Sequence, residues 1–499
     1  MLNASVKTDS WKQRKIHLDE IEQYMQSDRD FIDDAALTRA ITANRNPDPL
    51  RIRETIAKSL AIETLTIDEA AALLNVSDPD LLAEMEAAAE QIKKKVYDNR
   101  IVTFAPLYLS NYCVNNCRYC GFRLENKKIR RMTLSMDEIR RETEVLCGDI
   151  GHKRLIVVYG EHPVSDIGYM VESIRTIYDV AVPVRRGTGQ IRRVNVNAAP
   201  LCVEDLKRLH AVGIGTFQVF QETYHHATYT RLHPADTIKG NYRWRLYCMH
   251  RAFDAGVDDF GIGALFGLAD WRFEVLGLLA HTHELERAVG IGPHTLSFPR
   301  LEPAKNTPFL QDSRLRVAEA DFRKAVTVLR LVVPYTGMIL TARESAETRR
   351  ALLPLGITQV DASSRIGVGA YANPAVDNFQ DNRQQFVLGD LRSLEEVIRE
   401  LAEAGTITSF CTAGYRCGRT GKRIMELLRS GKEGKFCKLN AVLTFREWLD
   451  DFASPETSAA AEPVIQSEIE EIKRQQPGMV ETFMEYYRRI ADGERDIYL

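Results

Sequence analysis

The chain has 499 residues, of which 44% are hydrophobic and 27% charged, so a large core is available and global disorder is excluded. Its 66 Lys and Arg against 69 Asp and Glu give a net charge of −3, which offers no argument for a nucleic-acid partner. Residues 1–15 lack the apolar segment of a secretion signal, and no run approaches the ~18 apolar residues of a membrane span, so we expect a cytoplasmic protein without a membrane partner.

Residues 1–100 predict a helical N-terminal extension. Amphipathic runs at 67–74 and 81–92 are rich in Ala, Glu and Leu, a composition and spacing that favour helices. We interpret this extension as a brace for the catalytic domain that follows.

Residues 101–405 alternate short β-branched runs with longer helical stretches, the pattern of an α/β protein with a (β/α)8 TIM-type barrel. The expected strands are 101–109, 154–159, 193–197, 216–221, 259–265, 295–300, 338–341 and 358–362. The expected helices are 136–147, 169–178, 203–211, 242–255, 271–287, 315–332, 346–353 and 394–404. Active sites of such barrels lie at the C-terminal ends of the strands, so polar residues at those ends become the candidates.

Residues 406–499 predict a C-terminal extension with a second group of cysteines. A Ser, Ala and Pro segment at 454–463 is expected to be a linker with little structure of its own. A charged helix is expected over 464–490, packed back on the body of the protein.

The first cysteine group, Cys113, Cys117 and Cys120, directly follows the first expected strand. Three thiolates on a short loop can bind three irons of a 4Fe-4S cluster and leave the fourth iron open to another ligand. Zinc usually takes four ligands in two pairs, and no second pair lies nearby in the sequence. A disulfide would leave one of the three cysteines unpaired, so we favour the cluster.

Other polar residues follow the expected strands. Gly160 and Glu161 end the second strand, Gln221, Glu222 and Thr223 end the fourth, Arg343 follows the seventh, and Ser363 and Ser364 follow the eighth. We expect all of them around one cavity. An arginine at the barrel mouth presents a fork that matches a carboxylate, although Glu344 or Glu347 could instead pair with it on the surface. The two serines could add hydroxyl contacts to the same carboxylate.

Several segments together resemble one family closely. They are Ser-Asn-Tyr at 110–112 with the cysteine loop, Tyr-Gly-Glu-His-Pro at 159–163, Phe-Gln-Val-Phe-Gln-Glu-Thr-Tyr-His at 217–225, Phe-Pro-Arg at 298–300 and Ser-Phe-Cys-Thr-Ala at 409–413. They resemble the aromatic amino-acid lyases of the radical S-adenosylmethionine (SAM) superfamily, and most of all the tyrosine lyases that mature FeFe-hydrogenase. The tyrosine lyases of the thiamine pathway are close relatives, and membership of that group is the alternative to exclude.

The resemblance implies a 4Fe-4S cluster whose open iron binds SAM, with Tyr119 near the adenine and with Gly160 and Glu161 receiving the SAM ammonium. It implies L-tyrosine as substrate, with Arg343 binding its carboxylate. The expected reaction breaks the Cα–Cβ bond and gives p-cresol and dehydroglycine (2-iminoacetate). The resemblance also implies an electron donor such as ferredoxin or flavodoxin.

The second cysteine group departs from the family pattern. The hydrogenase maturases carry Cys-x2-Cys-x22-Cys, which holds an auxiliary cluster where dehydroglycine becomes CO and cyanide. Aligned on Cys411, the third position is Cys437, but the second is Gly414, and a cysteine stands three residues later at Cys417. Cys417 could replace the missing ligand, the site could be degenerate, or the residues could be a zinc site or free thiols.

A histidine is expected to bind an extra iron of that cluster, by the same resemblance. His294 is the candidate, with His281 and His283 as alternatives on a helix. A location of His294 at the bottom of the barrel would argue against this role.

The sequence thus leaves three hypotheses for function. A maturase-type tyrosine lyase would make CO and cyanide for metallocofactor assembly with partner proteins. A lyase without a working auxiliary cluster would stop at dehydroglycine or act on another aromatic amino acid. A scaffold for iron–sulfur assembly would leave Glu161 and Arg343 unexplained.

Overall fold

The computed structural model describes residues 11, 14–25, 27, 29–304, 306–307, 309, 315–373, 383–430 and 433–499. Within these ranges, each helix is too short or too polar to cross a bilayer.

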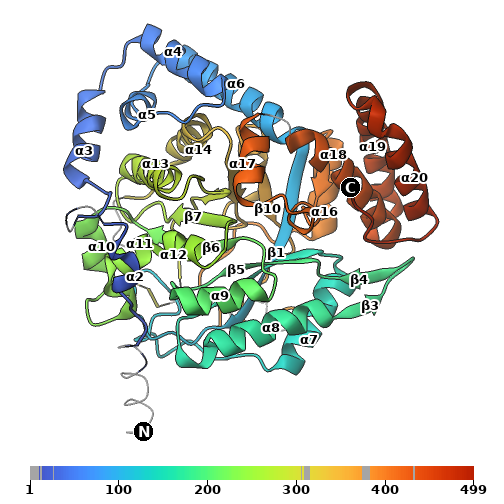
Figure 1. The fold of residues 1–499 in the computed structure, drawn as a ribbon, viewed down its shortest axis with the longest axis horizontal. Coiled ribbons are helices and arrows are strands. Elements are labelled where there is room, and N and C mark those ends of the chain that lie inside the picture. The colour runs from blue at the N-terminus through green and yellow to red at the C-terminus, as the bar shows by residue number, and fades with distance from the viewer. Residues whose placement is uncertain are drawn as a thin grey trace.

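Eight parallel strands close into a barrel, which confirms the predicted (β/α)8 fold (Figure 1). They are β1 (Arg100–Ser110), β2 (Arg154–Tyr159), β5 (Arg193–Asn197), β6 (Phe217–Glu222), β7 (Phe260–Ala264), β8 (Thr295–Ser297), β9 (Gly337–Leu340) and β10 (Gln359–Asp361). They follow one another in this order, and β10 pairs back onto β1 through Val102 and Gln359. Each expected strand is present because its β-branched residues are buried on both faces, as parallel strands require.

Helices cover the outside of the barrel. They are α7 (Met136–Glu144), α8 (Ile167–Asp179), α9 (Val203–Ala211), α10 (His226–Leu232), α11 (Tyr242–Leu246), α12 (Cys248–Asp254), α13 (Trp271–Ala288), α14 (Glu319–Val332), α15 (Ala346–Leu352) and α16 (Leu394–Glu403). Capping boxes at Ser135 and Ser393 begin two of them. The single helix expected over 242–255 is wrong, because Tyr247 leaves the helical conformation and separates α11 from α12.

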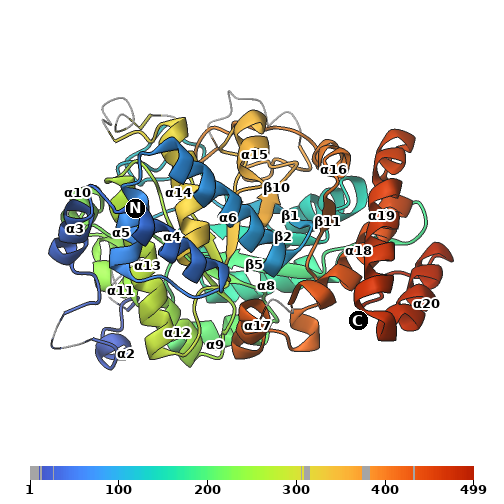
Figure 2. The same cartoon turned by 90° about the horizontal axis from the view of Figure 1, so that it is seen from above.

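The N-terminal extension is helical in the structure. It contains α2 (Asp19–Glu22), α3 (Asp34–Ala43), α4 (Pro49–Leu60), α5 (Ile67–Leu74) and α6 (Pro79–Tyr97). Helices α5 and α6 pack on α14, as Figure 2 shows from above. On α10, His226 lies between Asp30 and Asp34, which raise the pKa of its imidazole to about 9. The extension is thereby held to the barrel wall at both places.

The C-terminal residues continue the barrel sheet and then form helices. Strand β11 (Ile407–Ser409) pairs in parallel with the start of β1. It is followed by α17 (Gly421–Arg429), α18 (Glu433–Phe452), α19 (Pro455–Gln475) and α20 (Val480–Ala491), and α18 to α20 are the red helices at one side of the barrel in Figure 1. On α18, the buried carboxylate of Glu447 accepts from Lys153 at 2.7 Å and from Arg192 at 2.5 Å.

Two expectations for this region are wrong. The segment 454–463 is the first half of α19 and not a linker. Ser454 caps the helix by accepting from the backbone N–H of Thr457, and both residues donate to Glu395 on α16. The expected helix over 464–490 is interrupted at Pro477, so that α19 and α20 are separate helices.

Candidate active site

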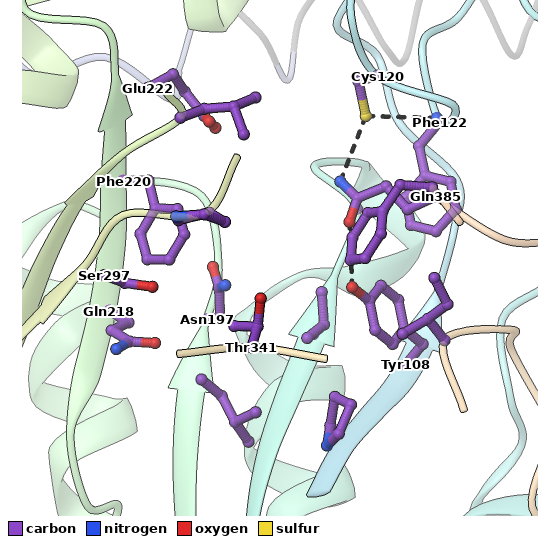
Figure 3. Close-up of a pocket in the computed structure, with 18 of the residues that line it drawn as sticks. Tyr108, Cys120, Phe122, Asn197, Gln218, Phe220, Glu222, Ser297, Thr341 and Gln385 are labelled. Carbon is purple, nitrogen blue, oxygen red and sulfur yellow. Dashed lines mark hydrogen bonds between the residues drawn. The ribbon is translucent and has the colours of Figure 1, made fainter. Parts of the chain in front are cut away.

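A cavity of about 220 Å³ opens at the C-terminal ends of the barrel strands. Figure 3 shows part of its lining, with Cys120 and Glu222 on opposite sides of the mouth and Asn197, Gln218, Ser297 and Thr341 deeper in the barrel. The cavity also reaches Cys113, Cys117, Tyr119, Gly160, Glu161 and Arg343. The rule that active-site residues lie at the C-terminal ends of the barrel strands, here called the strand-end rule, therefore identified residues that line one cavity.

The cysteine loop is held so that its sulfurs receive hydrogen bonds. The Sγ of Cys120 accepts from the backbone N–H of Phe122 and from the Gln385 amide, both at 3.4 Å, and the Sγ of Cys113 accepts from Asn115 at 3.8 Å. All three cysteines are free thiols. Donors aimed at sulfur stabilise thiolates and cluster ligands.

These residues fit a cubane cluster better than a single ion. Among the described residues, no three His, Cys, Asp or Glu side chains lie close enough to hold one metal ion. In a cubane each thiolate binds a different iron, so the sulfurs must stand further apart. Burial raises the pKa of Cys113 to about 11 and that of Cys117 to about 12, so these thiols need a cation to become thiolates.

The turn after β2 is tied to the cysteine loop. The backbone N–H of Val114 donates to the Glu161 carbonyl at 2.8 Å, and the Asn115 amide donates to one Glu161 carboxylate oxygen at 2.5 Å. The other carboxylate oxygen, Oε1, is buried without a partner among the described residues. A Cβ at Gly160 would lie 2.1 Å from the Tyr112 carbonyl oxygen, so only glycine fits there. One acceptor thus faces the cavity beside the cysteines.

Tyr119 lies in the cavity wall beside the second cysteine. Its ring stands edge-on to His233, and its hydroxyl is 2.8 Å from the His233 Nε2. This contact fixes the ring orientation, so the phenol presents a rigid aromatic surface to the cavity.

Arg343 is a half-buried cation without a carboxylate partner in the described structure. Its guanidinium lies over the ring of Phe386, with 3.3 Å between the guanidinium carbon and the ring centroid. Glu344, which could have paired with it, instead accepts two hydrogen bonds from Arg300 Nε at 3.0 Å. Burial lowers the pKa of Arg343, and an anion in the cavity would offset this desolvation.

Ser363 and Ser364 do not line the cavity, contrary to expectation. The Ser363 hydroxyl accepts from the backbone N–H of Leu394 at the start of α16. The Ser364 hydroxyl donates to Asp361 at 2.5 Å. Serines near turns bond readily to local groups, and here Asp361 is the residue of this segment that reaches the cavity.

The strand-end rule pointed to Glu222 at the end of β6, which lines the cavity, but sequence reasoning missed the two cations that make it part of an ion cluster. Glu222 adopts a left-handed φ of 73° and accepts from Lys239 at 2.6 Å, while Arg245 lies 3.5 Å away. These two cations lower the pKa of Glu222 despite its burial. A non-glycine residue in this conformation at a strand end is a signal that only the structure reveals.

It also missed the neutral polar groups deeper in the barrel, which we call the polar floor: Asn197, Gln218, Ser297 and Thr341. The Gln218 amide donates to Thr295, while the hydroxyl oxygen of Thr341 is buried without a partner in the described structure. Hydroxyl and amide groups with unused capacity can bind a polar substrate group. Thr341 directly follows β9, so the rule that active-site residues follow the barrel strands could have found it.

The second cysteine group lies at the opposite, N-terminal end of the barrel, beyond β11. Cys411 and Cys437 line a separate cavity of about 20 Å³, together with Gly414. Cys417 is not among its lining residues. The Sγ of Cys417 lies 3.7 Å from the backbone oxygen of Leu499, to which it donates.

His294 lies at this end as well, at the start of β8. Its Nδ1 is 2.9 Å from Asp259, which also accepts from Arg193, and Arg193 Nη1 donates to the Cys411 carbonyl at 3.3 Å. We expected a location at the bottom of the barrel to argue against His294 as an iron ligand. Cys411 lies at the same end of the barrel, however, so the location of His294 does not exclude this role.

The other two candidate histidines, on α13, have their side chains in contact with other parts of the protein. His281 is buried beside the Tyr224 hydroxyl, and burial lowers the pKa of its imidazole to about 3. The Nε2 of His283 lies 2.9 Å from the Leu65 carbonyl. The partners of both histidines, Tyr224 and Leu65, lie outside the second cysteine group.

Comparison with known proteins agrees with this geometry. The model of the Radical SAM superfamily matches residues 107–276, and that of the Biotin and Thiamin Synthesis associated domain matches residues 297–407. The 2-iminoacetate synthase of Escherichia coli (strain K12) is 31% identical over 371 residues, covering 74% of this chain and 93% of that protein.

Two solved structures are similar over nearly the whole chain. HydG, a maturase of the [FeFe]-hydrogenase, is 44% identical with a TM-score of 0.89, covering 94% of this chain and 100% of that one. The FeFe-hydrogenase maturase HydG from Carboxydothermus hydrogenoformans is 37% identical with a TM-score of 0.75, covering 92% and 97%.

Proposed function

The chain belongs to the radical SAM lyases that include 2-iminoacetate synthase and the maturase HydG, and we propose that it cleaves the Cα–Cβ bond of L-tyrosine to p-cresol and dehydroglycine. Enzymes of this superfamily use a 4Fe-4S cluster with SAM, a small-molecule substrate and an electron donor. Cys113, Cys117 and Cys120 would hold the cluster. The observation that carries the choice of substrate is the pairing of an unpartnered arginine with the polar floor in one cavity.

The bound cluster and SAM would supply a 5′-deoxyadenosyl radical, which takes a hydrogen atom from the tyrosine amino group. The protein's own residues hold the two reactants. The free Oε1 of Glu161 would accept from the SAM ammonium, and the Tyr119 ring would lie against the adenine. The closed barrel keeps water away from the reacting centre.

Arg343 would bind the tyrosine carboxylate with two parallel hydrogen bonds. Glu302 also lines the cavity, and burial raises the pKa of its carboxyl while Arg343 opposes this rise. A cation and a carboxylate on one side of the cavity match the carboxylate and the amine of an amino acid. We propose that Glu302 binds the amine.

The polar floor would bind the phenol. Thr341 directly follows β9, and Thr341 and Arg343 line the same cavity. With the carboxylate on Arg343, the phenol hydroxyl would bond to the Thr341 oxygen, which is buried without a partner in the described structure. Phe104, Ile156 and Ile339 form an apolar cluster that would pack against the ring.

The electron donor has to act twice in each turnover. One electron releases the radical from SAM, and a second, with a proton, reduces the 4-hydroxybenzyl radical to p-cresol. We propose ferredoxin or flavodoxin as the donor. Partner proteins of metallocofactor assembly belong to this proposal only where dehydroglycine is processed further at the second cysteine group.

Anaerobic turnover with dithionite, SAM and L-tyrosine tests the proposal. We expect p-cresol and 5′-deoxyadenosine in equal amounts. A protein with an intact, SAM-responsive cluster that forms no p-cresol would refute the tyrosine-lyase assignment.

A further inference from the structure

The cavity of the second cysteine group offers two thiols and not three. Cys411 and Cys437 line it, and the third position that faces it is Gly414. A Cβ placed on Gly414 would meet only the Arg419 Nε, at 4.0 Å. The backbone therefore leaves room for a side chain directed at this cavity, and glycine supplies no ligand there.

Cys417 is turned away from this cavity and held there. It ends a 3₁₀ turn, Tyr415–Cys417, and donates to the Leu499 backbone oxygen. The same oxygen accepts from Arg419 at 3.0 Å and from Asn440 at 2.9 Å. Turning Cys417 toward the other two thiols would break this set of contacts.

The chain end covers the cavity. Residues 496–498 belong to its lining. Asp496 is held by two hydrogen bonds from Arg416, at 2.7 and 2.8 Å, and the Arg416 guanidinium lies 4.2 Å from the ring centroid of Tyr498. These contacts hold the chain end in the wall of the cavity.

The available space is too small for a cluster. A cavity of about 20 Å³ has room for roughly one water molecule. The first cysteine group, which offers three thiols, faces about 220 Å³. Iron–sulfur clusters depend on thiolates for their irons, and two thiolates would leave half of a cubane unligated.

We infer that the second cysteine group of this chain holds no iron–sulfur cluster, and that the enzyme releases dehydroglycine as its final product. The second half of this statement rests on the proposed tyrosine cleavage. Released dehydroglycine is an imine, and water converts it to glyoxylate and ammonia with no change in oxidation state. A downstream enzyme that uses this product must therefore accept an α-imino acid.

Iron and acid-labile sulfide content of the reconstituted protein test the first half. We expect about four irons per chain in the wild type, the content of one cubane. The Cys437→Ser variant should keep this content, as should the control Cys202→Ser, which alters a cysteine that lines neither cavity.

Two results would overturn the inference. One is a wild type that holds about eight irons per chain, the content of two cubanes. The other is a wild type that loses about half of its iron on Cys437→Ser but none on Cys202→Ser. Electron paramagnetic resonance of the reduced wild type should likewise show a single cluster signal, and that signal should change on addition of SAM.

Product analysis tests the second half and separates it from the proposed function. p-Cresol with an equal amount of glyoxylate, and no CO or cyanide, supports the inference. p-Cresol with CO and cyanide overturns it while leaving tyrosine cleavage intact. Absence of p-cresol would refute the proposed function alone, since the iron content is measured without turnover.

Discussion

Replacement of Arg343 and replacement of Arg300 by Gln should have opposite effects on protein stability, although both arginines lie near the mouth of the barrel. Arg343 has no carboxylate partner in the described structure, whereas Arg300 binds Glu344, which is only 2% exposed. Replacing Arg343 by Gln removes a desolvated cation and leaves no buried anion unpaired. We therefore expect Arg343→Gln to leave the free energy of unfolding unchanged or slightly higher.

The same substitution should strongly impair catalysis. A bidentate arginine–carboxylate contact consists of two charge-assisted hydrogen bonds of about 1.5–3 kcal/mol each, so its loss should cost about 3–5 kcal/mol. This corresponds to a fall in kcat/KM for tyrosine of about 10²–10⁴-fold. Arg343→Lys keeps the charge but not the fork, and should recover about a tenth to a third of the lost activation free energy.

Arg300→Gln is the matched control. It leaves the Glu344 carboxylate buried without its partner, and breaking a buried pair in this way costs about 3–5 kcal/mol of stability. Urea denaturation of the apoproteins and initial rates of p-cresol formation measure the two effects. If Arg343→Gln unfolds as readily as Arg300→Gln, or keeps wild-type kcat/KM, Arg343 is a structural residue and the substrate-binding argument fails.

Three further predictions concern other parts of the molecule. Thr341→Val should lower kcat/KM for tyrosine by about tenfold while leaving inhibition by phenylalanine unchanged, because only tyrosine carries the hydroxyl; equal losses for both would refute the polar floor. Gly160→Ala should weaken SAM binding, seen as a smaller spectral change of the cluster on adding SAM, since its Cβ would collide with the Tyr112 carbonyl. The His226 pKa is raised to about 9, so its stabilisation is complete below the ordinary value of 6.5 and is lost as pH rises through 9. As the side chain is about one-third exposed, we expect about 1 kcal/mol, and His226→Gln should abolish that slope in urea titrations.

The barrel could be predicted because its signals are local. Each strand is a short run of residues buried on both faces, and Ser-Glu capping boxes mark the starts of helices such as α7 and α16. The segment 454–463 failed because its helix depends on contacts that are distant in sequence. Ser454 is held by Glu395, 59 residues earlier, and composition alone cannot indicate that contact.

The active site could be predicted to the extent that it lies at strand ends. That rule located the cysteine loop, the turn at Gly160 and Glu161, and Arg343. It failed for Ser363 and Ser364, whose hydroxyls are taken by neighbouring groups. It also did not single out Thr341, which directly follows β9 and lines the cavity. The Cys417 side chain points toward the Leu499 backbone oxygen and away from Cys411 and Cys437. The spacing of the cysteines in the sequence could not indicate this orientation, because it depends on how the chain end folds.

The interior of the barrel also favours release of the product at the mouth. The two cavities share no lining residue. The layer below the first cavity is occupied by guanidinium groups, since Arg154 donates to Gln359 at 2.8 Å and Arg193 donates to Asn195 at 3.1 Å and Asp259 at 2.6 Å. These side chains are buried and hydrogen-bonded to their polar neighbours, so a product moving toward Cys411 would have to break several charge-assisted hydrogen bonds. Exit past the cysteine loop breaks none of them, so dehydroglycine formed beside Arg343, as we propose, would have its easier path back toward solvent.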